Sequence, residues 1–474
     1  MATALRIPLA AAPALVLPET RGFYIEHAKG FSAEALGEEI DRAARAGFNV
    51  VVFPIYINGY TLFPSVVARE APFDSLHPDF RRWDPLAVAL ERCHGHGMSL
   101  WGLARAYNFH PRYSAAPQRL LRRFPQWSMR IHPQYRTSPL RRRESYVACP
   151  INPSYRRYLA GLLAEVVMAY PIDGVVLNLS GYGLRGGSLE ASPFCFCPAC
   201  AERYRQARGA DLIETALTEA GIADVRQWQT EASMQALEYI RHRVIKTRRT
   251  LRLLCRAQPQ WRWNADFAGP MLHAPYCLDW NRALGSGIVE ALIVDHDDER
   301  APELFSARLV SDLAELHQDA LFVPAVQVER PEDLEAPLAA VRRYPVSGLV
   351  VEWVEAFEPD QADAVRRRFF SEPASVPEGA PLPSVALLLR RIGERHAENP
   401  LIGDFMRDFL RLVRRAFQDG ASYHDLSVIL ENLVGLQEAI RRRRLGGYHV
   451  PESTLRDLSL ARRILRLALL DVRS

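Results

Sequence analysis

Three cysteines, Cys195, Cys197 and Cys200, stand within six positions of one another, and a fourth, Cys149, lies upstream before Pro150. Thiolates in the pattern C-x-C-x-x-C point toward one centre, and a fourth thiolate from another loop completes a tetrahedral sulfur shell. Zn²⁺ is the usual occupant of such a shell. Because four sulfurs leave no open coordination position, we predict a structural zinc ion that braces loops and does not activate water. Buried free thiols are the alternative interpretation.

Carboxylates follow several apolar runs that are typical of buried strands. The candidates for catalytic carboxylates are Glu26, Asp266, Asp295, Glu329 and Glu352. The ends of the strands of one barrel gather at one face, so this ring of acids fits an active site. The alternative for each acid is a loop charge, or an ion pair with one of the many arginines.

Aromatic and polar side chains lie in the same runs or directly follow them. The candidates for ligand contacts are Tyr56, Trp101, Arg105, Tyr107, Asn108 and Trp353. Aromatic platforms with polar neighbours suit sugars, so together these residues favour a polar, saccharide-like ligand over a lipid. Aromatic residues in such loops also cap hydrophobic cores, which is the alternative interpretation of each of them.

Eight short apolar or β-branched runs alternate with amphipathic stretches and predict eight strands. They are Gly22–Glu26, Asn49–Ile55, Ser99–Ala104, Gly174–Asn178, Arg262–Asp266, Glu290–Asp295, Leu321–Gln327 and Gly348–Trp353. Strands that alternate with helices indicate parallel βα units, and eight units make a (β/α)₈ TIM barrel. An open doubly wound sheet is the second interpretation, which the absence of a G-x-G-x-x-G loop after the first run disfavours.

The chain divides into four segments in this interpretation. Residues 1–19 form an N-terminal extension, and residues 20–370 form the α/β barrel with a zinc-braced insertion after its fourth strand. The stretch 371–389 is rich in Pro, Ser, Glu and Gly and is typical of a linker. From 390 to 474 the apolar residues recur at helical spacing, which predicts a small C-terminal all-α bundle.

Composition limits the class of partner and the compartment. A net charge of +4 over 474 residues is too small and too dispersed to indicate nucleic-acid binding. Only Lys29 and Lys246 are lysines, a bias typical of a GC-rich bacterial genome. We find no apolar run of the roughly 18 to 20 residues that a membrane span needs, and two prolines in the apolar N-terminus disfavour a signal peptide. Free cysteines suit a reducing compartment, so we expect a cytoplasmic protein, with a secreted or periplasmic location left open.

Several segments together resemble one group of proteins. The runs 47–53, 96–101 and 152–158 are similar to the early barrel units of bacterial hypothetical glycoside hydrolases, relatives of the family-10-like glycosylhydrolases. The cysteine motif is the most specific part of the likeness. It also resembles the metal cluster of family 42 β-galactosidases, in which a Cys-Pro like that at 149–150 supplies the fourth ligand. The likeness spans about residues 20–360 and leaves the helical tail without a match.

The resemblance implies hydrolysis of O-glycosyl bonds in a polysaccharide or glycoconjugate by paired carboxylates at the barrel mouth. One acid of the family is expected at the end of strand four, where this chain has Asn178 followed by Leu179. The acid is missing in either alignment of this run, and we count Asn178 among the ligand-binding residues. An amide cannot protonate a departing oxygen, so an active hydrolase would take its pair from the five acids named above.

Two other functions stay open at this point. The barrel is alternatively a pseudoenzyme that binds a saccharide without cleaving it, with the helical tail as an interaction module. An unrelated barrel lyase or isomerase is the third hypothesis. We expect a carbohydrate ligand, no nucleic acid, and a homo-oligomer or a protein partner bound through the C-terminal helices.

Overall fold

The computed structural model describes most of the chain. The described residues are 17–25, 32–70, 76–107, 109, 117–137, 144, 147–179, 195–248, 251–257, 278–296, 305–307, 309–310, 313, 321–354, 356–377, 379, 381–396, 406, 408–413, 415, 422–445 and 450–473.

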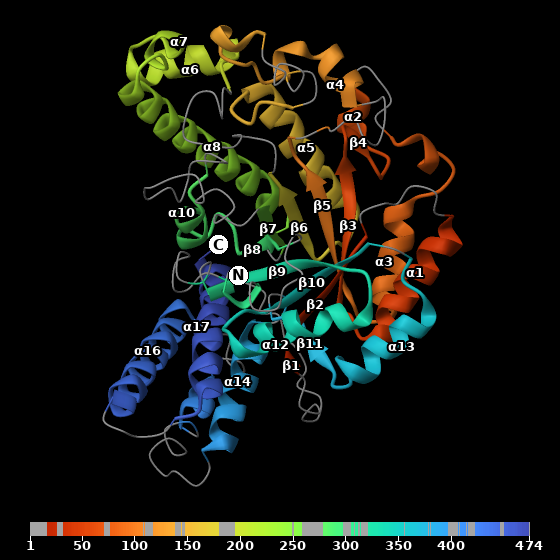
Figure 1. The fold of residues 1–474 in the computed structure, drawn as a ribbon, viewed down its shortest axis with the longest axis vertical. Helices are drawn as coiled ribbons and strands as arrows, with labels where there is room; N and C mark the ends of the chain where they lie inside the picture. Colours follow the sequence, from red (N-terminus) through yellow and green to blue (C-terminus); the bar gives the residue numbers. More distant parts are fainter. Residues whose placement is uncertain are drawn as a thin grey trace.

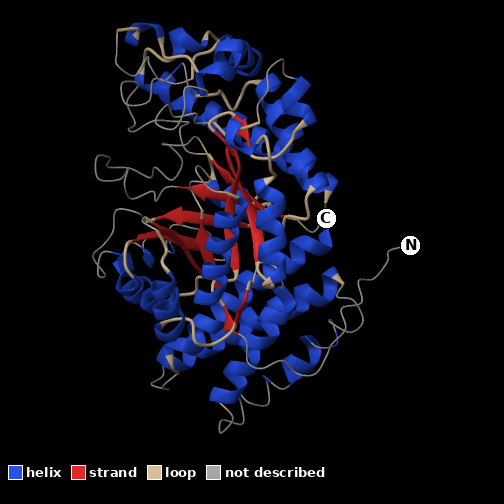
Figure 2. Cartoon of the chain, turned by 90° about the vertical axis from the view of Figure 1, so that its right-hand side faces the viewer, coloured by secondary structure: helices blue, strands red, loops and turns tan. Residues whose placement is uncertain are grey.

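Eight parallel strands close into a barrel, as the sequence predicts (Figure 1). In chain order they are β2 (Thr20–Tyr24), β3 (Val50–Ile57), β5 (Ser99–Arg105), β6 (Gly174–Asn178), β7 (Arg252–Ala257), β8 (Ala291–Asp295), β9 (Leu321–Val328) and β10 (Gly348–Trp353). Strand β2 pairs with both β10 and β3, which closes the ring, and the short β4 (Tyr60–Thr61) forms a hairpin with β3. Figure 2 shows helices surrounding the strands.

One predicted strand is wrong. The fifth strand of the barrel is β7, at Arg252–Ala257, and not the predicted run Arg262–Asp266. Arginines at positions 252 and 256 match helical spacing and interrupt the apolar run that a buried parallel strand usually shows. Alternation along the strand places both on the inner face, beside Leu254. The other predicted strands start and end within two residues of the observed ones.

Helices on the outside of the barrel begin and end at local signals. Helix α1 (Ala33–Ala46) starts after Ser32, whose hydroxyl accepts a hydrogen bond from the backbone N–H of Ala35, and ends at Gly47 with φ of 95°. Helix α5 (Pro153–Ala169) starts after the N-cap Asn152. Other helices in the described part of the barrel region are α2 (Val66–Glu70), α3 (Pro85–Gly95), α4 (Pro117–Arg123), α6 (Pro198–Arg208), α7 (Leu212–Thr215), α8 (Glu219–Thr247), α10 (Trp280–Gly285), α12 (Glu335–Arg343) and α13 (Pro359–Arg368).

Two buried layers hold the barrel together. Side chains such as Val51, Phe53 and Leu253 point outward and pack under the helices, while Val52 and Ile293 point inward and fill the barrel. Each fully buried aliphatic side chain contributes on the order of 2 kcal/mol by leaving water. The filled interior is a core and not a channel, so chemistry is confined to the mouth, the end where the strands terminate.

A C-terminal helical region lies against the floor, the end where the strands begin (Figure 1). It contains α14 (Pro381–Arg395), α16 (Tyr423–Leu445) and α17 (Glu452–Arg473), so the first helix begins inside the stretch 371–389 assigned to a linker. From α17, Arg456 Nε donates to the Tyr344 carbonyl at 3.3 Å and Arg466 Nη2 donates to the Gly285 carbonyl at 2.8 Å. Tyr344 follows α12 ahead of β10, and Gly285 ends α10 ahead of β8, so this region is docked on the barrel.

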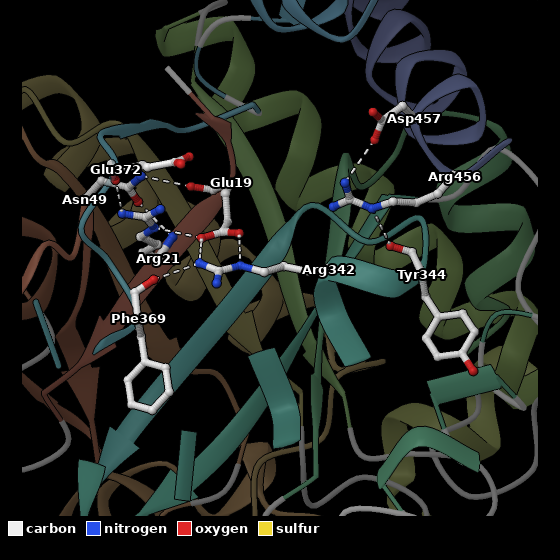
Figure 3. A network of polar contacts seen from close by, with 9 residues as sticks. All are labelled: Glu19, Arg21, Asn49, Arg342, Tyr344, Phe369, Glu372, Arg456 and Asp457. Atoms are coloured by element: carbon white, nitrogen blue, oxygen red, sulfur yellow. Dashed lines mark hydrogen bonds and ion pairs between the residues drawn. The ribbon is translucent and has the colours of Figure 1, made fainter. Parts of the chain in front are cut away.

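Ion pairs reinforce the floor beside this contact (Figure 3). The Glu19 carboxylate accepts from Arg21 Nε at 2.7 Å and from Arg342 Nε at 3.1 Å. Strand β1 (Leu17–Pro18) pairs with β11 (Ala374–Ser375), which joins the start of the barrel to the segment that leads into α14. No helix in the described part of the chain is long and apolar enough to cross a membrane.

Candidate active site and metal site

Four buried side chains converge inside the mouth. Arg256 of β7 donates from Nε to Asp295 Oδ1 of β8 at 2.6 Å and from Nη2 to Glu352 Oε2 of β10 at 3.4 Å. Its guanidinium carbon lies 4.7 Å from the centre of the Tyr24 ring at the end of β2. The three charged residues are each at most 9% exposed. Two of the predicted catalytic acids, Asp295 and Glu352, are therefore brought together.

Polar residues continue this site along neighbouring strands. Asn178 ends β6 on the inner face, in register with Arg105 of β5 on one side and with Arg256 of β7 on the other. Both Asn178 and Arg105 are partly exposed. These two predicted ligand-binding residues thus lie at the same end of the barrel as Asp295 and Glu352. The strand order places an amide and two cations on one side of the mouth and the two carboxylates on the other.

Three predicted ligand-binding aromatics lie instead in the outer layer of the core. A register shift between Pro54 and Tyr56 turns the Tyr56 side chain outward, where it is fully buried and its ring lies 6.0 Å from that of Phe109. Tyr107 is buried in the same layer, and Trp353 packs on Phe357 with ring centres 4.5 Å apart. Burial raises the pKa of the Tyr56 and Tyr107 hydroxyls well above the usual value, so both stay neutral.

Trp101 points inward near the floor of the barrel. It is the third residue of β5, and its ring contacts the space that a side chain at Gly174 would occupy. It also lines a cavity of about 440 Å³ between the floor and residues 374–379. The structure thus places Trp101 at the opposite end from Asp295 and Glu352.

Of the remaining predicted acids, the structure describes only Glu329. Glu329 directly follows β9 and is half-buried, and its backbone N–H donates to the Asp333 carboxylate at 3.1 Å. Glu26, Asn108 and Asp266 lie outside the described residues. With β7 at 252–257, Asp266 does not end the fifth strand.

Neither Tyr24 nor Arg256 is among the candidates that the sequence offers, and Arg256 is the charged residue of the two. The spacing of Arg252 and Arg256 also fits a helix, so the local sequence alone does not show that Arg256 points into a barrel. A signal was present: on strand β7 the polar positions 252 and 256 alternate with apolar ones, as an inner face with a charged end requires. A buried arginine needs carboxylate partners, which points to acids on adjacent strand ends.

Four cysteine sulfurs form a second site, apart from the mouth. The Sγ atoms of Cys149, Cys195, Cys197 and Cys200 all lie within 4.8 Å of one another and are buried. The backbone N–H of Arg130 donates to Cys195 Sγ at 3.4 Å. This donor set and spacing fit a tetrahedral metal ion, for which zinc–sulfur bonds are about 2.3 Å. The predicted gathering of these four residues is confirmed, and they could hold a metal ion.

The cluster has its own small core. Cys197 precedes α6, and α6 packs through Tyr204 on Trp228 of α8, with ring centres 5.2 Å apart. Hydrogen bonding from Cys149 and the other thiols lowers the pKa of the Cys197 thiol, whereas burial raises that of Cys149. A metal requires its sulfur ligands deprotonated, so a bound cation would offset the cost of burying the other thiolates of this cluster.

The two sites differ in what they can do chemically. Two carboxylates at the end of a filled barrel, beside an amide and cations, can carry acid–base or nucleophilic chemistry on a polar ligand. Four sulfurs around a metal leave it no free position, so the cysteine site can brace the loops after β5 and β6 but cannot activate a substrate.

Comparison with solved structures shows where this fold recurs. The PgaB (BpsB) glycoside hydrolase domain from Bordetella bronchiseptica superimposes with a TM-score of 0.53 at 14% identity, over 76% of this chain and 100% of that one. The catalytic domain of β-amylase from Paenibacillus polymyxa gives a TM-score of 0.53 at 10% identity, over 75% and 99%. At these identities the likeness concerns the fold alone.

Sequence comparison relates the chain to a family. The glycosyl hydrolase DigH of Escherichia coli (strain K12) is 26% identical over 147 residues, which are 30% of this chain and 33% of the relative, so the match spans a third of that protein. The family model described as glycosyl hydrolase-like 10 matches residues 19–296, more than half of the chain. The resemblance found in the sequence is thereby confirmed, and the chain belongs to the glycosyl hydrolase-like 10 family.

Proposed function

We propose that this protein binds a polysaccharide or the glycan of a glycoconjugate at the barrel mouth and hydrolyses a glycosidic bond there. The observation that carries the proposal is the buried pair Asp295 and Glu352, held on β8 and β10 by one guanidinium. Membership of a glycosyl hydrolase-like family supports the reaction class, since such barrels use two carboxyl groups at strand ends.

The spacing of the pair suits this chemistry. One carboxyl group, in its protonated form, protonates the leaving oxygen, and the other attacks the sugar or activates water. Because both carboxyl oxygens contact nitrogens of Arg256, they are no more than roughly 8 Å apart, which is below the upper limit of about 10 Å for such pairs. Asn178 and Arg105 end neighbouring strands at the same end of the barrel and offer hydrogen bonds to sugar hydroxyls.

Hydrolysis of soluble oligosaccharides and aryl glycosides tests the proposal. The wild-type chain should release reducing ends, and Asp295→Asn and Glu352→Gln should each lower kcat by about 10³-fold or more, the cost of losing one member of a reacting pair. Glu202→Gln, an exposed acid on α6, is the matched control and should leave kcat unchanged. A kcat equal to that of the wild type in both variants would show that these residues do not take part in the reaction.

A second candidate is saccharide binding without cleavage. The observation in its favour is Asn178, which ends β6 where the resemblance expects an acid. Tight binding of an oligosaccharide by a wild-type chain that does not cleave it would support this function. Gain of hydrolysis in Asn178→Asp would indicate a lost catalyst, whereas high activity of the wild type would refute the second candidate.

We also infer that Zn²⁺ occupies the four-cysteine site. Its support is the all-sulfur donor set, the burial of all four sulfurs and the N–H···S contact from Arg130. Metal analysis of the purified protein should find about one zinc per chain, because four thiolates bind a single tetrahedral ion. A metal-free protein of undiminished stability would contradict this assignment.

The thiols bear on the compartment as well. Cys93 and Cys255 are free and fully buried, and burial raises the pKa of both thiols. Free thiols together with a thiolate cluster support a location in the reducing cytoplasm. Fractionation of cells that express the full-length chain tests this placement.

A further inference from the structure

Arg256 occupies an unusual position for a charged residue. It lies on the inner face of β7, one residue before the strand ends, and is only 9% exposed. Its backbone is in register with Asn178 of β6 and Ile293 of β8. The guanidinium is therefore carried by a rigid strand whose place in the barrel is fixed on both sides.

The contacts of this side chain cross the barrel. Nε reaches Asp295 on the adjacent strand, Nη2 reaches Glu352 two strands further on, and the cation lies over the ring of Tyr24 on β2. Strand β9 separates the two carboxylate-bearing strands. One side chain thus connects the fifth, sixth, eighth and first strands of the ring at the height where they end.

The shape of guanidinium matters for this arrangement. Its N–H donors are held in one plane at fixed angles, so two acceptors bound to Nε and Nη2 are held at a set spacing. A lysine ammonium supplies the same charge at a single point and cannot impose that spacing. Without a cation, two buried carboxylates would also repel each other and remain poorly solvated.

We propose that Arg256 is a positioning residue, which fixes the spacing and orientation of the Asp295 and Glu352 carboxyl groups at the barrel mouth. The inference rests on the proposed function in taking these two groups as the reacting pair. Arg256 acts through them: it neutralises their charge, holds their oxygens along its plane and is itself kept in place by Tyr24.

We call the contacts of Arg256 with Asp295 and Glu352 the clamp. Thermal unfolding of full-length variants tests the clamp without reference to activity. Arg256→Gln should unfold several degrees below wild type, and Asp295→Asn with Glu352→Gln should also be destabilised, since each takes an oppositely charged partner away from a buried charge. The triple variant that carries all three changes should unfold at a higher temperature than Arg256→Gln and than the double variant Asp295→Asn with Glu352→Gln. Arg205→Gln, on the exposed face of α6, is the control and should unfold with the wild type. A triple variant no more stable than Arg256→Gln would overturn the clamp.

Kinetics of Arg256→Lys tests the positioning itself. This variant keeps the charge, so it should unfold within about 1 °C of wild type, yet kcat should fall about 100-fold with KM changed less than about 2-fold. A purely structural role would leave kcat unaltered in a variant of normal stability, and that result would refute positioning. A wild type without any hydrolysis would instead refute the proposed function, and the unfolding comparison would still decide whether Arg256 clamps the pair.

Discussion

Replacing Glu19 by glutamine perturbs the barrel floor at one defined point (Figure 3). The carboxylate is 6% exposed and accepts from Arg21 Nε at 2.7 Å and from Arg342 at 3.1 and 3.2 Å. Glutamine keeps one acceptor oxygen but loses the charge, which leaves the nearly fully buried Arg21 without its anion. Breaking a buried ion pair costs about 3 to 5 kcal/mol, and we take about 3 kcal/mol for this substitution because an acceptor remains.

This free energy corresponds to a modest shift in the unfolding midpoint. With an unfolding entropy of about 2.1 cal/mol/K per residue, 3 kcal/mol lowers the midpoint of a chain of 474 residues by about 3 °C. Calorimetry near pH 7 measures the shift. The control is Glu38→Gln, whose exposed carboxylate lies 3.8 Å from Arg42 and should contribute about 0.5 kcal/mol or less.

The pH dependence of the effect follows from the pKa of Glu19. Burial acts to raise it, but hydrogen bonds from Arg342 and the charge of Arg21 outweigh burial and hold the pKa below the usual 4.5. Stabilisation by a carboxylate with a lowered pKa is complete above pH 4.5 and is lost as pH falls through the lowered value. The gap between wild type and Glu19→Gln should therefore shrink below pH 4.5. An equal gap at acidic and neutral pH would refute this electrostatic account.

Three further predictions concern the metal site, the strand-four position and the barrel seam. Cys197→Ser should lose zinc and unfold earlier, whereas Cys93→Ser, a buried thiol outside the cluster, should keep its zinc by metal analysis. Asn178→Asp should raise the rate on aryl glycosides when the wild type is weakly active, and an unchanged rate would show that this position is not the lost acid. Gly348→Ala should be destabilised by more than about 2 kcal/mol in denaturant titration, because a Cβ there would lie 1.9 Å from the carbonyl oxygen of Thr20; wild-type stability would contradict that close approach.

Local signals explain the elements that the sequence located well. The bounds of α1 and α5 follow from the local sequence, because Ser32, Gly47 and Asn152 mark helix ends by capping chemistry that acts within a few residues. The cysteine cluster was also recognisable, since three ligands lie in one short run and only Cys149 comes from a distant loop. These features depend on spacing along the chain.

Features that depend on pairing between distant strands were not predictable in this way. Arg256 is tolerated inside the barrel because Asp295 lies 39 positions away in the chain and Glu352 lies 96 away. The register shift that turns Tyr56 outward arises where β3 pairs with β5, and nothing in the local sequence marks it. The predicted strand that contains Trp101 does not show at which end of the barrel this side chain lies. The structure places it near the start of β5, at the floor and not at the mouth.

Turnover by the wild-type chain and by Asp295→Asn and Glu352→Gln, on the same soluble glycan and under the same conditions, tests the central claim most directly. We expect reducing ends from the wild type and a loss of about 10³-fold or more in kcat in each variant, with their folds intact by circular dichroism. Undiminished turnover in either variant would contradict the assignment of this buried pair as the reacting groups.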